Sequence, residues 1–572
     1  MEQVVQKLKT GKLNVVEVPT PVLNNGKLLV KNYYSLISAG SEGSTVKTAR
    51  KGYIGKAKER PEQFKQVLQT LKSHGPVQTY RAVMKKLDSY SPLGYSCTGQ
   101  VINMASDVRG FAIGDLVACG GLTASHAEIV SVPVNLCVKL AKDVDMKQAA
   151  YNTLGAIAMQ GVRQADLRLG ESCAVIGLGL LGQLTCLLLK ASGVRVVGID
   201  VDQEMVELAS RHCADLAATR EESGLESRIK NFADGLGCDA VVITAASKSL
   251  DPINFAGSIC RKRGTIVVVG DVPTGFSREP HFYKKELQLR MSCSYGPGRY
   301  DPFYEEKGLD YPPAYVRWTE KRNMQAFQTL LQEKRMDLGY LTTHVFKLED
   351  APEAYDLMME KAERFIGILI EYDTTKKTKN DPIVNSALED QRSKESAVKI
   401  GFIGAGSYAQ GNLLPNVPNH PSVSLKGVLT SSGASSRSVM ERFGFEFCAS
   451  QEKELLENDD INTIFIATRH DSHADFVIKA LRAKKNVFVE KPLCLNEQEL
   501  SDIRECLSSM MVEGQPNNPN RTNPTNTPNQ PLLMVGFNRR FAPLSQKLKG
   551  VFPQGPLAMI YRVNAGAIPA DS

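Results

Sequence analysis

Two short glycine-containing stretches, far apart in the chain, have the spacing of a loop that holds the phosphates of a dinucleotide. Each follows an apolar run and leads into a segment with helical spacing. In such a loop the first glycine allows a tight turn, the second lets the backbone approach a pyrophosphate, and the third position lets helix and strand pack closely. The sequence therefore predicts two dinucleotide sites, at Gly177, Gly179 and Gly182 and at Gly404, Gly406 and Ala409.

The residues that follow each loop indicate which cofactor is used. Eighteen residues after Gly182, the stretch "VRVVGID" ends at Asp200. Its carboxylate can accept hydrogen bonds from ribose hydroxyls and would repel a 2′-phosphate, so we expect NAD at the first site. The corresponding stretch of the second site, "VLTSSGASSR", has no acid, and Thr430, Ser431 and Arg437 would tolerate a phosphate. NAD and NADP both remain open there.

A third stretch, residues 294–323, combines tyrosines, arginines and acids with the only tryptophan of the chain. Aromatic faces stack on sugar rings, and guanidinium groups form paired hydrogen bonds with carboxylates or phosphates. This composition predicts a carbohydrate-type small-molecule substrate, with an anionic group, and the substrate-binding candidates Tyr295, Arg299, Arg317 and Trp318. The alternative is an ordered loop that covers a cleft or joins subunits of a homo-oligomer.

The elements that must position these residues follow from hydrophobic patterning. Short strands separated by glycine turns fill residues 1–145 and predict a small β-barrel. Strands alternate with helical patterns over 146–290 and again over 398–513, which predicts an α/β protein with two parallel sheets. Between them lie residues 291–372, which end in a return to the first domain, and a polar linker at 373–397. Residues 514–531 hold six Asn and five Pro and are expected to form a mobile loop before a final segment, 532–572.

Composition narrows the class of protein further. The chain has 572 residues, 42% hydrophobic and 23% charged, which fits a globular protein of several domains. The N-terminus lacks the features of a secretory signal, and no apolar stretch is long enough to span a bilayer. The twelve cysteines form no CxxC pair, so we expect a reducing, cytoplasmic location. His470 and His473 are the only close histidines and lack a third ligand. We therefore expect no metal site, no membrane span and no nucleic acid partner.

Positive charge is concentrated in one predicted insertion, residues 43–90. Residues 47–86 contain eleven Lys and Arg against Glu59 and Glu62, a net charge of +9, whereas the whole chain carries +7. Helical apolar spacing predicts two amphipathic helices in this segment. They present either a solvated basic face or a rim that attracts an anionic substrate.

Residues 1–372 resemble the medium-chain dehydrogenase/reductase superfamily, in which a GroES-like β-barrel catalytic domain is interrupted by a Rossmann domain. Zinc-containing members carry a Cys near "ISAGSE" and a His-Glu pair in "PLGHE". This chain has Ala39, Tyr95 and Ser96 at those positions, and the four-cysteine lobe is missing between "GDLVACGG" and "HAEIV". The resemblance therefore implies a zinc-independent enzyme. In such an enzyme Tyr95 and Ser96 would take the place of the metal and donate a hydrogen bond or proton to the carbonyl oxygen of the substrate. The alternative for Tyr95 is that it only fills the vacated space.

Residues 398–543 are similar to the glucose-fructose oxidoreductase/inositol dehydrogenase/MocA family. The resemblance rests on the second glycine loop, on "TIFIATRHDSH", on "VFVEKPL" and on "GFNRRFAP". It implies that Lys491 is a catalytic lysine beside the nicotinamide, flanked by the cofactor-binding residues Glu490 and Pro492. It also implies that only the start of an α+β substrate domain is present, so that Lys491 is well placed but largely idle.

The combination of both resemblances is typical of bacterial two-domain oxidoreductases associated with polysaccharide synthesis. It predicts an NAD(P)-dependent dehydrogenase that transfers a hydride to or from a sugar, a sugar nucleotide or a related polyol. The alternative is a dinucleotide-binding scaffold or redox sensor without turnover.

Overall fold

The computed structural model describes residues 1–51, 87–361, 363–377, 382–385, 397–513 and 531–551, with scattered positions between 65 and 84. The chain forms two compact units, Met1–Ile461 and Asn462–Ser572. The two predicted amphipathic helices of the basic insertion lie mostly outside the described residues, as does nearly all of the Asn/Pro-rich loop.

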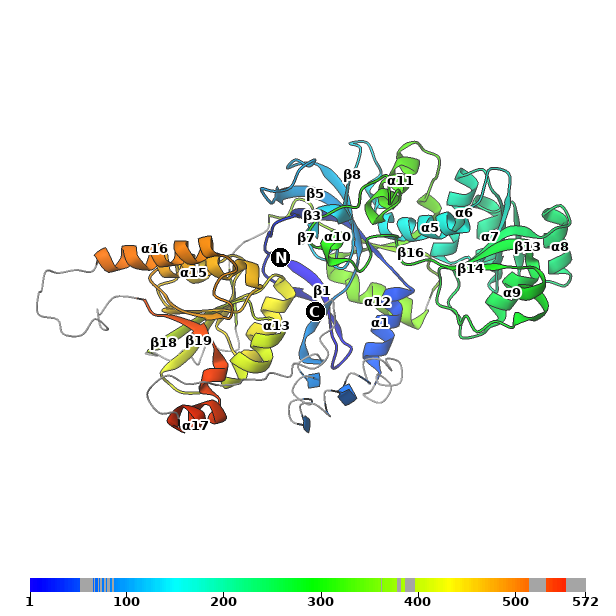
Figure 1. Cartoon of the computed structure of the whole chain (residues 1–572). Helices are drawn as coiled ribbons and strands as arrows, with labels where there is room; N and C mark the ends of the chain where they lie inside the picture. The colour runs from blue at the N-terminus through cyan, green and yellow to red at the C-terminus, as the bar shows by residue number, and fades with distance from the viewer. Residues whose placement is uncertain are drawn as a thin grey trace, which may run out of the picture. The chain divides into compact units, whose positions relative to one another are not determined.

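The N-terminal part of the first unit is a β-barrel-like domain of two sheets (Figure 1). One sheet has the order β2-β1-β4, and the other has the order β15-β16-β3-β5-β6-β8, with β7 paired to β3. Most neighbours are antiparallel, whereas β15 and β16 are parallel. Its strands are β1 (Glu2–Lys7), β2 (Leu13–Glu17), β3 (Lys27–Ile37), β4 (Tyr90–Pro92), β5 (Ser96–Met104), β6 (Leu116–Gly120), β7 (Ile129–Pro133), β8 (Cys137–Lys139), β15 (Thr342–Lys347) and β16 (Gly367–Glu371). Its helices are α1 (Ser41–Arg50) and α12 (Ala351–Glu360).

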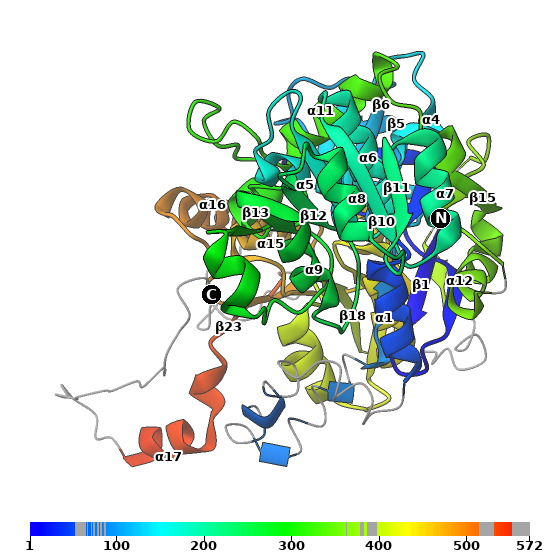
Figure 2. The same ribbon diagram turned by 90° about the vertical axis from the view of Figure 1, so that its right-hand side faces the viewer.

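A six-stranded parallel sheet follows, in the order β11-β10-β9-β12-β13-β14 that is typical of a Rossmann fold. Successive strand residues point to opposite faces, so Val175 joins the core under α5, α6 and α7, while Ala174 joins the core under α8 and α9. Helices therefore cover both faces (Figure 2). The elements are α4 (Met146–Ala149), α5 (Asn152–Ala165), β9 (Ser172–Ile176), α6 (Leu180–Ala191), β10 (Arg195–Asp200), α7 (Gln203–His212), β11 (Leu216–Thr219), α8 (Leu225–Phe232), β12 (Cys238–Ile243), α9 (Asp251–Ile259), β13 (Cys260–Val268), β14 (Gln288–Met291), α10 (Pro302–Glu305) and α11 (Glu320–Gln332).

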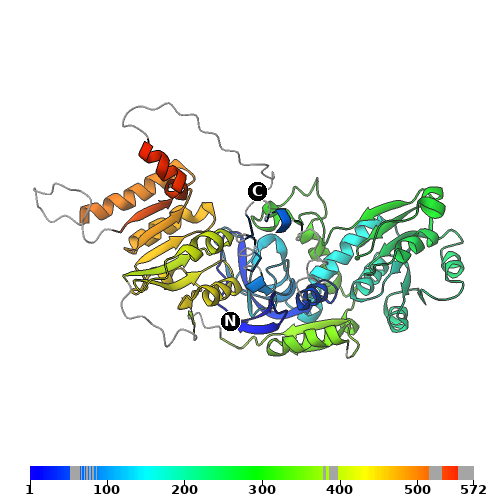
Figure 3. The ribbon, with the colours of Figure 1, turned by 90° about the horizontal axis from the view of Figure 1, so that it is seen from below.

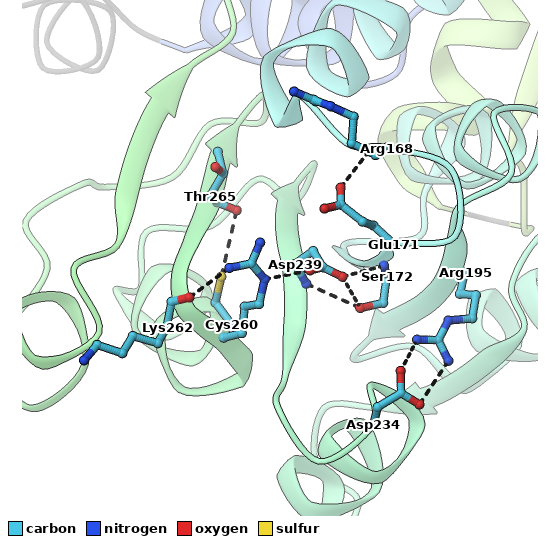
Figure 4. Close-up of polar contacts among 10 residues, drawn as sticks. Arg168, Glu171, Ser172, Arg195, Asp234, Asp239, Cys260, Lys262 and Thr265 are labelled. Atoms are coloured by element: carbon cyan, nitrogen blue, oxygen red, sulfur yellow. Dashed lines mark hydrogen bonds and ion pairs between the residues drawn. The ribbon is translucent and has the colours of Figure 1, made fainter.

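Polar contacts hold together the edge of this sheet where the strands begin (Figure 4). Asp239 accepts hydrogen bonds from the backbone and hydroxyl of Ser172, at 2.8 and 3.0 Å, and Arg261 Nε donates to it at 2.6 Å. Nearby, Arg195 pairs with Asp234 at 2.6 Å. These contacts satisfy the polar groups at the amino ends of the strands. Ligands of open α/β sheets bind at the opposite edge, where the glycine loop lies.

The second glycine loop begins a further α/β region. Within the first unit its strands have the order β17-β20-β19-β18. The elements are β17 (Ile383–Val384), β18 (Val398–Ile403), β19 (Val423–Leu429), α13 (Gly433–Phe443), β20 (Phe447–Cys448) and α14 (Lys453–Leu456). The second unit continues with strands in the order β21-β22-β23. Its elements are β21 (Thr463–Ile466), α15 (His473–Arg482), β22 (Asn486–Glu490), α16 (Glu497–Glu513, orange in Figure 3), β23 (Leu533–Gly536) and α17 (Pro543–Val551).

The α/β class, the GroES-like barrel and the Rossmann-type sheets confirm the predicted fold, but two local features differ. Residues 373–397 are not only a linker, because β17 pairs antiparallel with β20 and Asn385 is buried against Phe445. After the second loop a helix was expected, and the structure has a continuous helical segment over residues 407–416 that passes from a π-helical turn at Ala409–Leu413 to a 3-10 turn at Leu414–Asn416. Pro415 lacks the N–H that a longer helix would need. In the described part of the chain, no helix is long and apolar enough to cross a membrane.

Candidate active site

The first glycine loop has the geometry of a phosphate cradle. Gly177 has a φ of +98°, and a side-chain carbon there would lie 2.6 Å from the backbone nitrogen of Ala245. A side-chain carbon at Gly182 would lie 1.9 Å from the carbonyl oxygen of Gly177. At Gly179, by contrast, nothing lies within 4 Å. Gly179 also precedes α6, whose first N–H groups have no side-chain cap, so the open position faces free backbone donors.

Asp200 lies where the sequence predicts it, at the end of β10. Its Oδ2 accepts a hydrogen bond from the backbone N–H of Leu178 at 2.5 Å, and its Oδ1 accepts one from Asp202 at 2.9 Å. The carboxylate is therefore fixed against the glycine loop and remains partly exposed. This position suits a group that binds the adenosine ribose of NAD.

Tyr95 and Ser96 have different surroundings. The Tyr95 hydroxyl donates to Ser38 Oγ at 2.7 Å, and burial raises the pKa of the phenol. Ser96 is fully buried, where its Oγ donates to the carbonyl of Ala150 at 2.7 Å and accepts from the N–H of Thr153 at 3.1 Å. Since the Ser96 hydroxyl already donates one hydrogen bond and accepts another, Ser96 is less suited than Tyr95 to exchange a proton with a substrate.

Behind Tyr95 lies a buried polar network that sequence reasoning missed. Ser38 N–H donates to Glu42 Oε1 at 2.9 Å, and Glu42 Oε2 lies 3.1 Å from His126 Nε2. The Tyr355 hydroxyl also donates to Glu42, and His126 Nδ1 lies 2.7 Å from Ser35 Oγ. Glu42 was visible only as part of "ISAGSE", and two of its partners, His126 in a loop and Tyr355 on α12, are distant in the sequence. The network fixes Ser38, and through it the Tyr95 hydroxyl.

The block at 294–323 forms a second buried polar cluster. Tyr295 is 3% exposed and its hydroxyl has no hydrogen-bond partner among the described residues. Arg299 does not face solvent freely, because it forms an ion pair with Glu305 at 2.5 Å. Glu320 is completely buried, and neither of its carboxyl oxygens has a partner within the described ranges. Burial and the neighbouring Glu305 raise the pKa of Glu320 to about 9. The sequence singled out Tyr295 and Arg299 but not Glu320.

Arg317 and Trp318 lie together at the beginning of α11. The Arg317 guanidinium carbon lies 3.9 Å from the centre of the Trp318 ring, and that of Arg163, from α5, lies 3.3 Å from it. Two cations therefore already contact the ring that was predicted to stack on a sugar. Arg163 has no sequence motif that would have identified it.

The second cradle is only partly described within the first unit. Gly404 has a φ of +83°, and nothing lies within 4 Å of a side-chain carbon at Gly406. Ala409 is buried. Among the residues proposed to tolerate a 2′-phosphate, the backbone N–H of Thr430 donates to Ser436 Oγ at 2.9 Å, and Arg437 Nε donates to Glu441 Oε1 at 2.6 Å.

In the second unit, Lys491 is exposed and directly follows the buried Glu490. Asn538 Nδ2 donates to Glu490 Oε1 at 3.0 Å, which fixes the carboxylate next to the lysine. The carbonyl of Pro492 lies 2.7 Å from Nδ1 of the buried His473. Glu490, Lys491 and Pro492 are thus held as one rigid corner. His473 has both ring nitrogens near carbonyl oxygens, which do not make a metal site.

Two family models match separate parts of the chain. Residues 181–306 match the zinc-binding dehydrogenase family, and residues 398–513 match an oxidoreductase family with an NAD-binding Rossmann fold. The chain joins two oxidoreductase modules. We call the part that matches the first family the dehydrogenase module. The chain is 28% identical over 272 residues to the D-guloside 3-dehydrogenases of Shigella flexneri and Escherichia coli, with 46% of this chain and 72% of each relative covered.

Two further proteins are similar to the chain. An uncharacterized oxidoreductase of Bacillus subtilis, YrbE, is 29% identical over 157 residues, which cover 27% of this chain and 40% of the relative. A solved Escherichia coli oxidoreductase/dehydrogenase of unknown specificity, involved in membrane biogenesis, has a TM-score of 0.50 at 18% identity and covers 65% of this chain and 100% of its own. That structure supports the fold alone.

The dehydrogenase module does not offer the ligands that its family name implies. Zinc binds Cys, His, Asp or Glu side chains in a tetrahedral array. At the family positions this chain has the methyl group of Ala39, a phenol whose pKa is raised, and the fully bonded hydroxyl of Ser96. Across the described ranges, no group of three or more His, Cys, Asp or Glu side chains is arranged to hold a metal ion. The residues present therefore do not fit zinc.

Proposed function

We propose that the dehydrogenase module moves a hydride between NAD and a carbon of a sugar, sugar nucleotide or related polyol without zinc. The observation that carries this proposal is that the Tyr95 side chain packs against the hydrophobic core that contains Leu178 of the glycine loop. The resemblance to the dehydrogenase family implies that Tyr95 stands where zinc-containing members have a metal ligand. When bound, the nicotinamide would supply or accept the hydride. Gly177, Gly179, Gly182 and Asp200 would hold the dinucleotide.

In this proposal Tyr95 handles the proton of the reacting hydroxyl. A sugar alcohol that becomes a carbonyl loses a proton from oxygen as the hydride leaves carbon. The Tyr95 oxygen exchanges that proton with the substrate, and its bond to Ser38 connects it to the Glu42 network. The raised pKa keeps the phenol protonated at neutral pH, which suits donation to a carbonyl in the direction of reduction.

The related D-guloside 3-dehydrogenases support a sugar as the substrate class. The resemblance to two-domain bacterial enzymes supports a role in polysaccharide synthesis in the cytoplasm. The second module would bind NAD or NADP through Gly404, Gly406, Ala409, Glu490 and Pro492. Lys491 would lie beside the nicotinamide of that second site.

Transfer of label from deuterated NADH to keto-sugars, with the whole chain, tests this function. We expect deuterium in the alcohol product. If the chain binds NADH but no sugar or sugar nucleotide accepts label, the alternative of a scaffold or redox sensor is favoured.

The first site should prefer NADH to NADPH because Asp200 carries its charge where a 2′-phosphate would lie. Asp200→Asn keeps the shape and should reduce the preference about tenfold, as expected for the loss of one charge repulsion of about 1.4 kcal/mol. Titration of both cofactors, with Asp202→Asn as a control on the neighbouring helix cap, measures the change. Tighter NADPH binding by the unmodified first site would contradict the assignment.

We expect no stoichiometric zinc in the purified protein, because Ala39, Tyr95 and Ser96 cannot form a tetrahedral site. Elemental analysis after purification without chelator measures the metal content directly. Treatment with a chelator should leave turnover unchanged. One tightly held zinc per chain would remove the basis for the role of Tyr95.

A further inference from the structure

The backbone of Leu178, in the middle of the first glycine loop, is held on both sides. Its N–H donates to Asp200 Oδ2 at 2.5 Å, and its carbonyl accepts a hydrogen bond from Gln183 Nε2 at 3.0 Å. The Leu178 side chain is completely buried, so the residue is packed as well as hydrogen-bonded. A loop whose central residue is fixed in this way keeps its shape before a ligand arrives, which lowers the cost of binding.

Gln183 itself is completely buried in the first turn of α6, and its amide group makes four hydrogen bonds. Besides Leu178, Nε2 donates to the carbonyl of Met205 at 3.3 Å. Oε1 accepts from the Cys213 thiol at 3.0 Å and from the Tyr340 hydroxyl at 3.3 Å. A glutamine amide offers two donors and two acceptor positions, so these contacts use all of them. The side chain is therefore fixed in one orientation.

One partner of Gln183 belongs to the chain that returns to the barrel. Tyr340 lies in the turn Gly339–Leu341, which leads directly into β15 of the barrel sheet. Its ring stacks on the ring of His212, at the end of α7, with the ring centres 3.9 Å apart and an angle of 7° between the planes. The stacking holds the Tyr340 hydroxyl toward Gln183. The barrel is thus connected to the glycine loop through a single side chain.

The buried side of α6 around Gln183 is mostly apolar. Leu184, Leu187 and Leu188 belong to the same core as Leu178. A hydrophobic residue at position 183 would pack there without needing a partner, whereas a buried amide is costly unless it is fully hydrogen-bonded. Packing alone therefore does not explain why a polar side chain lies here with its amide directed at the glycine loop.

We propose that Gln183 is a positioning residue for the pyrophosphate of the dinucleotide, and that Tyr340 holds it in the required orientation. The inference deepens the proposed function and rests on the first site being its cofactor site. Gln183 acts through Leu178, whose neighbour Gly179 opens onto the uncapped N–H groups at the start of α6. The affinity for the cofactor therefore depends on a contact that the barrel makes.

The affinity of the whole chain for NADH tests this inference without turnover. Every variant carries Gly406→Asp, which adds a carboxylate to the second glycine loop at an open position, so that NADH binding reports on the first site. Gln183→Met has a similar length but lacks the hydrogen bonds, and it should weaken NADH binding about tenfold or more. Adenosine has the ribose but no pyrophosphate. Its affinity should be nearly unchanged, because Asp200 is also held by the N–H of Asp202.

A milder change tests the contact from the barrel. Tyr340→Phe removes one hydroxyl and leaves the stacked ring, so it should weaken NADH binding about threefold. Tyr151→Phe is the matched control, because Tyr151 is buried in the same core and its hydroxyl lies 2.8 Å from Thr342 Oγ1, at the beginning of the same strand β15. Its NADH affinity should equal that of the unmodified chain.

Circular dichroism identifies a Gln183→Met chain that fails to fold, in which case the comparison of Tyr340→Phe with Tyr151→Phe decides. Unchanged NADH affinity in folded Gln183→Met, or equal affinities of the two tyrosine variants, would overturn the inference and leave the proposed function intact. Equal losses of NADH and adenosine binding would show a general distortion and would also overturn it. Gly179→Asp should abolish the remaining NADH binding. If that binding persists, or if the first site binds no NADH at all, the proposed cofactor site fails together with this inference.

Discussion

Glu320→Gln should make the protein more stable in alkaline solution and remove most of a steep pH dependence. Glu320 is completely buried, next to Glu305 and Arg299, and its pKa is raised to about 9. Burial is the main cause, the charge of Glu305 adds to it, and the charge of Arg299 opposes it. The folded chain therefore holds a proton that the unfolded chain releases at ordinary carboxyl pKa values.

The sign of the effect follows from proton linkage. Between the unfolded pKa and about 9, the folded state binds one more proton than the unfolded state, so the free energy of unfolding falls as pH rises. The stabilisation is complete below the unfolded pKa and is lost by about pH 9. Each pH unit in this window costs about 1.4 kcal/mol, which gives on the order of 4 kcal/mol between pH 5 and pH 8. Gln cannot ionise, so the variant lacks this loss.

Urea unfolding at pH 5 and pH 8 measures the difference. Glu333→Gln is the control, because Glu333 is exposed at the other end of α11 and should leave the pH dependence unchanged. Glu305→Gln should also reduce the fall in the free energy of unfolding between pH 5 and pH 8. The change removes the negative charge beside Glu320 and leaves the positive charge of Arg299 there. Parallel pH profiles for the unmodified protein and Glu320→Gln would show that Glu320 is ionised when folded.

Glu320 also shows what the sequence could not reveal. In "WTEKRN", Thr319 caps α11 and Glu320 occupies the first turn, where acids commonly lie exposed near the positive end of a helix. The local pattern thus predicts a solvated carboxylate. The buried position arises because the turn around Pro297 contacts this residue, with Glu320 N–H donating to the Pro297 carbonyl at 2.9 Å. Neither spacing nor composition contains that tertiary contact.

The glycine loops were predictable because their chemistry is local. Gly177 has a positive φ and Gly182 lies against the carbonyl of Gly177, so these two constraints arise within six residues of the loop. The parallel sheets followed from the alternation of strands and helices. The second loop shows the limit of this reasoning, since the helix that the pattern predicted is already irregular from Ala409 and ends at Asn416.

Charge partners were the least predictable feature of the candidate site. Arg299 and Arg317 looked equivalent in the sequence, but Glu305 neutralises only Arg299. Arg163 lies 155 positions before Trp318, in a helix that reads as ordinary core. Which arginine remains available to a substrate depends on such long-range contacts, and single-sequence patterns do not encode them.

Tyr95→Phe should lower turnover by about 10²- to 10⁴-fold while NADH binding is retained, because the change removes only the hydroxyl that exchanges a proton with substrate. The aromatic ring still fills the core, so the fold should persist. Tyr34→Phe is the matched control: Tyr34 is partly buried in the same barrel, and its hydroxyl donates to Glu371 at 2.7 Å. It should retain nearly full activity.

The pH dependence of turnover separates a chemical role of Tyr95 from a space-filling role. In the unmodified enzyme, the reduction of a carbonyl should persist to high pH, because burial raises the pKa of the phenol that donates the proton. Ser38→Ala removes the acceptor of the Tyr95 hydroxyl and should change kcat more than KM. A proton donor other than Tyr95 would leave kcat of Tyr95→Phe close to that of the Tyr34→Phe control. Tyr95 would then only fill the space that a metal site would occupy. The buried carboxyl of Glu320 would be the next candidate for the proton donor.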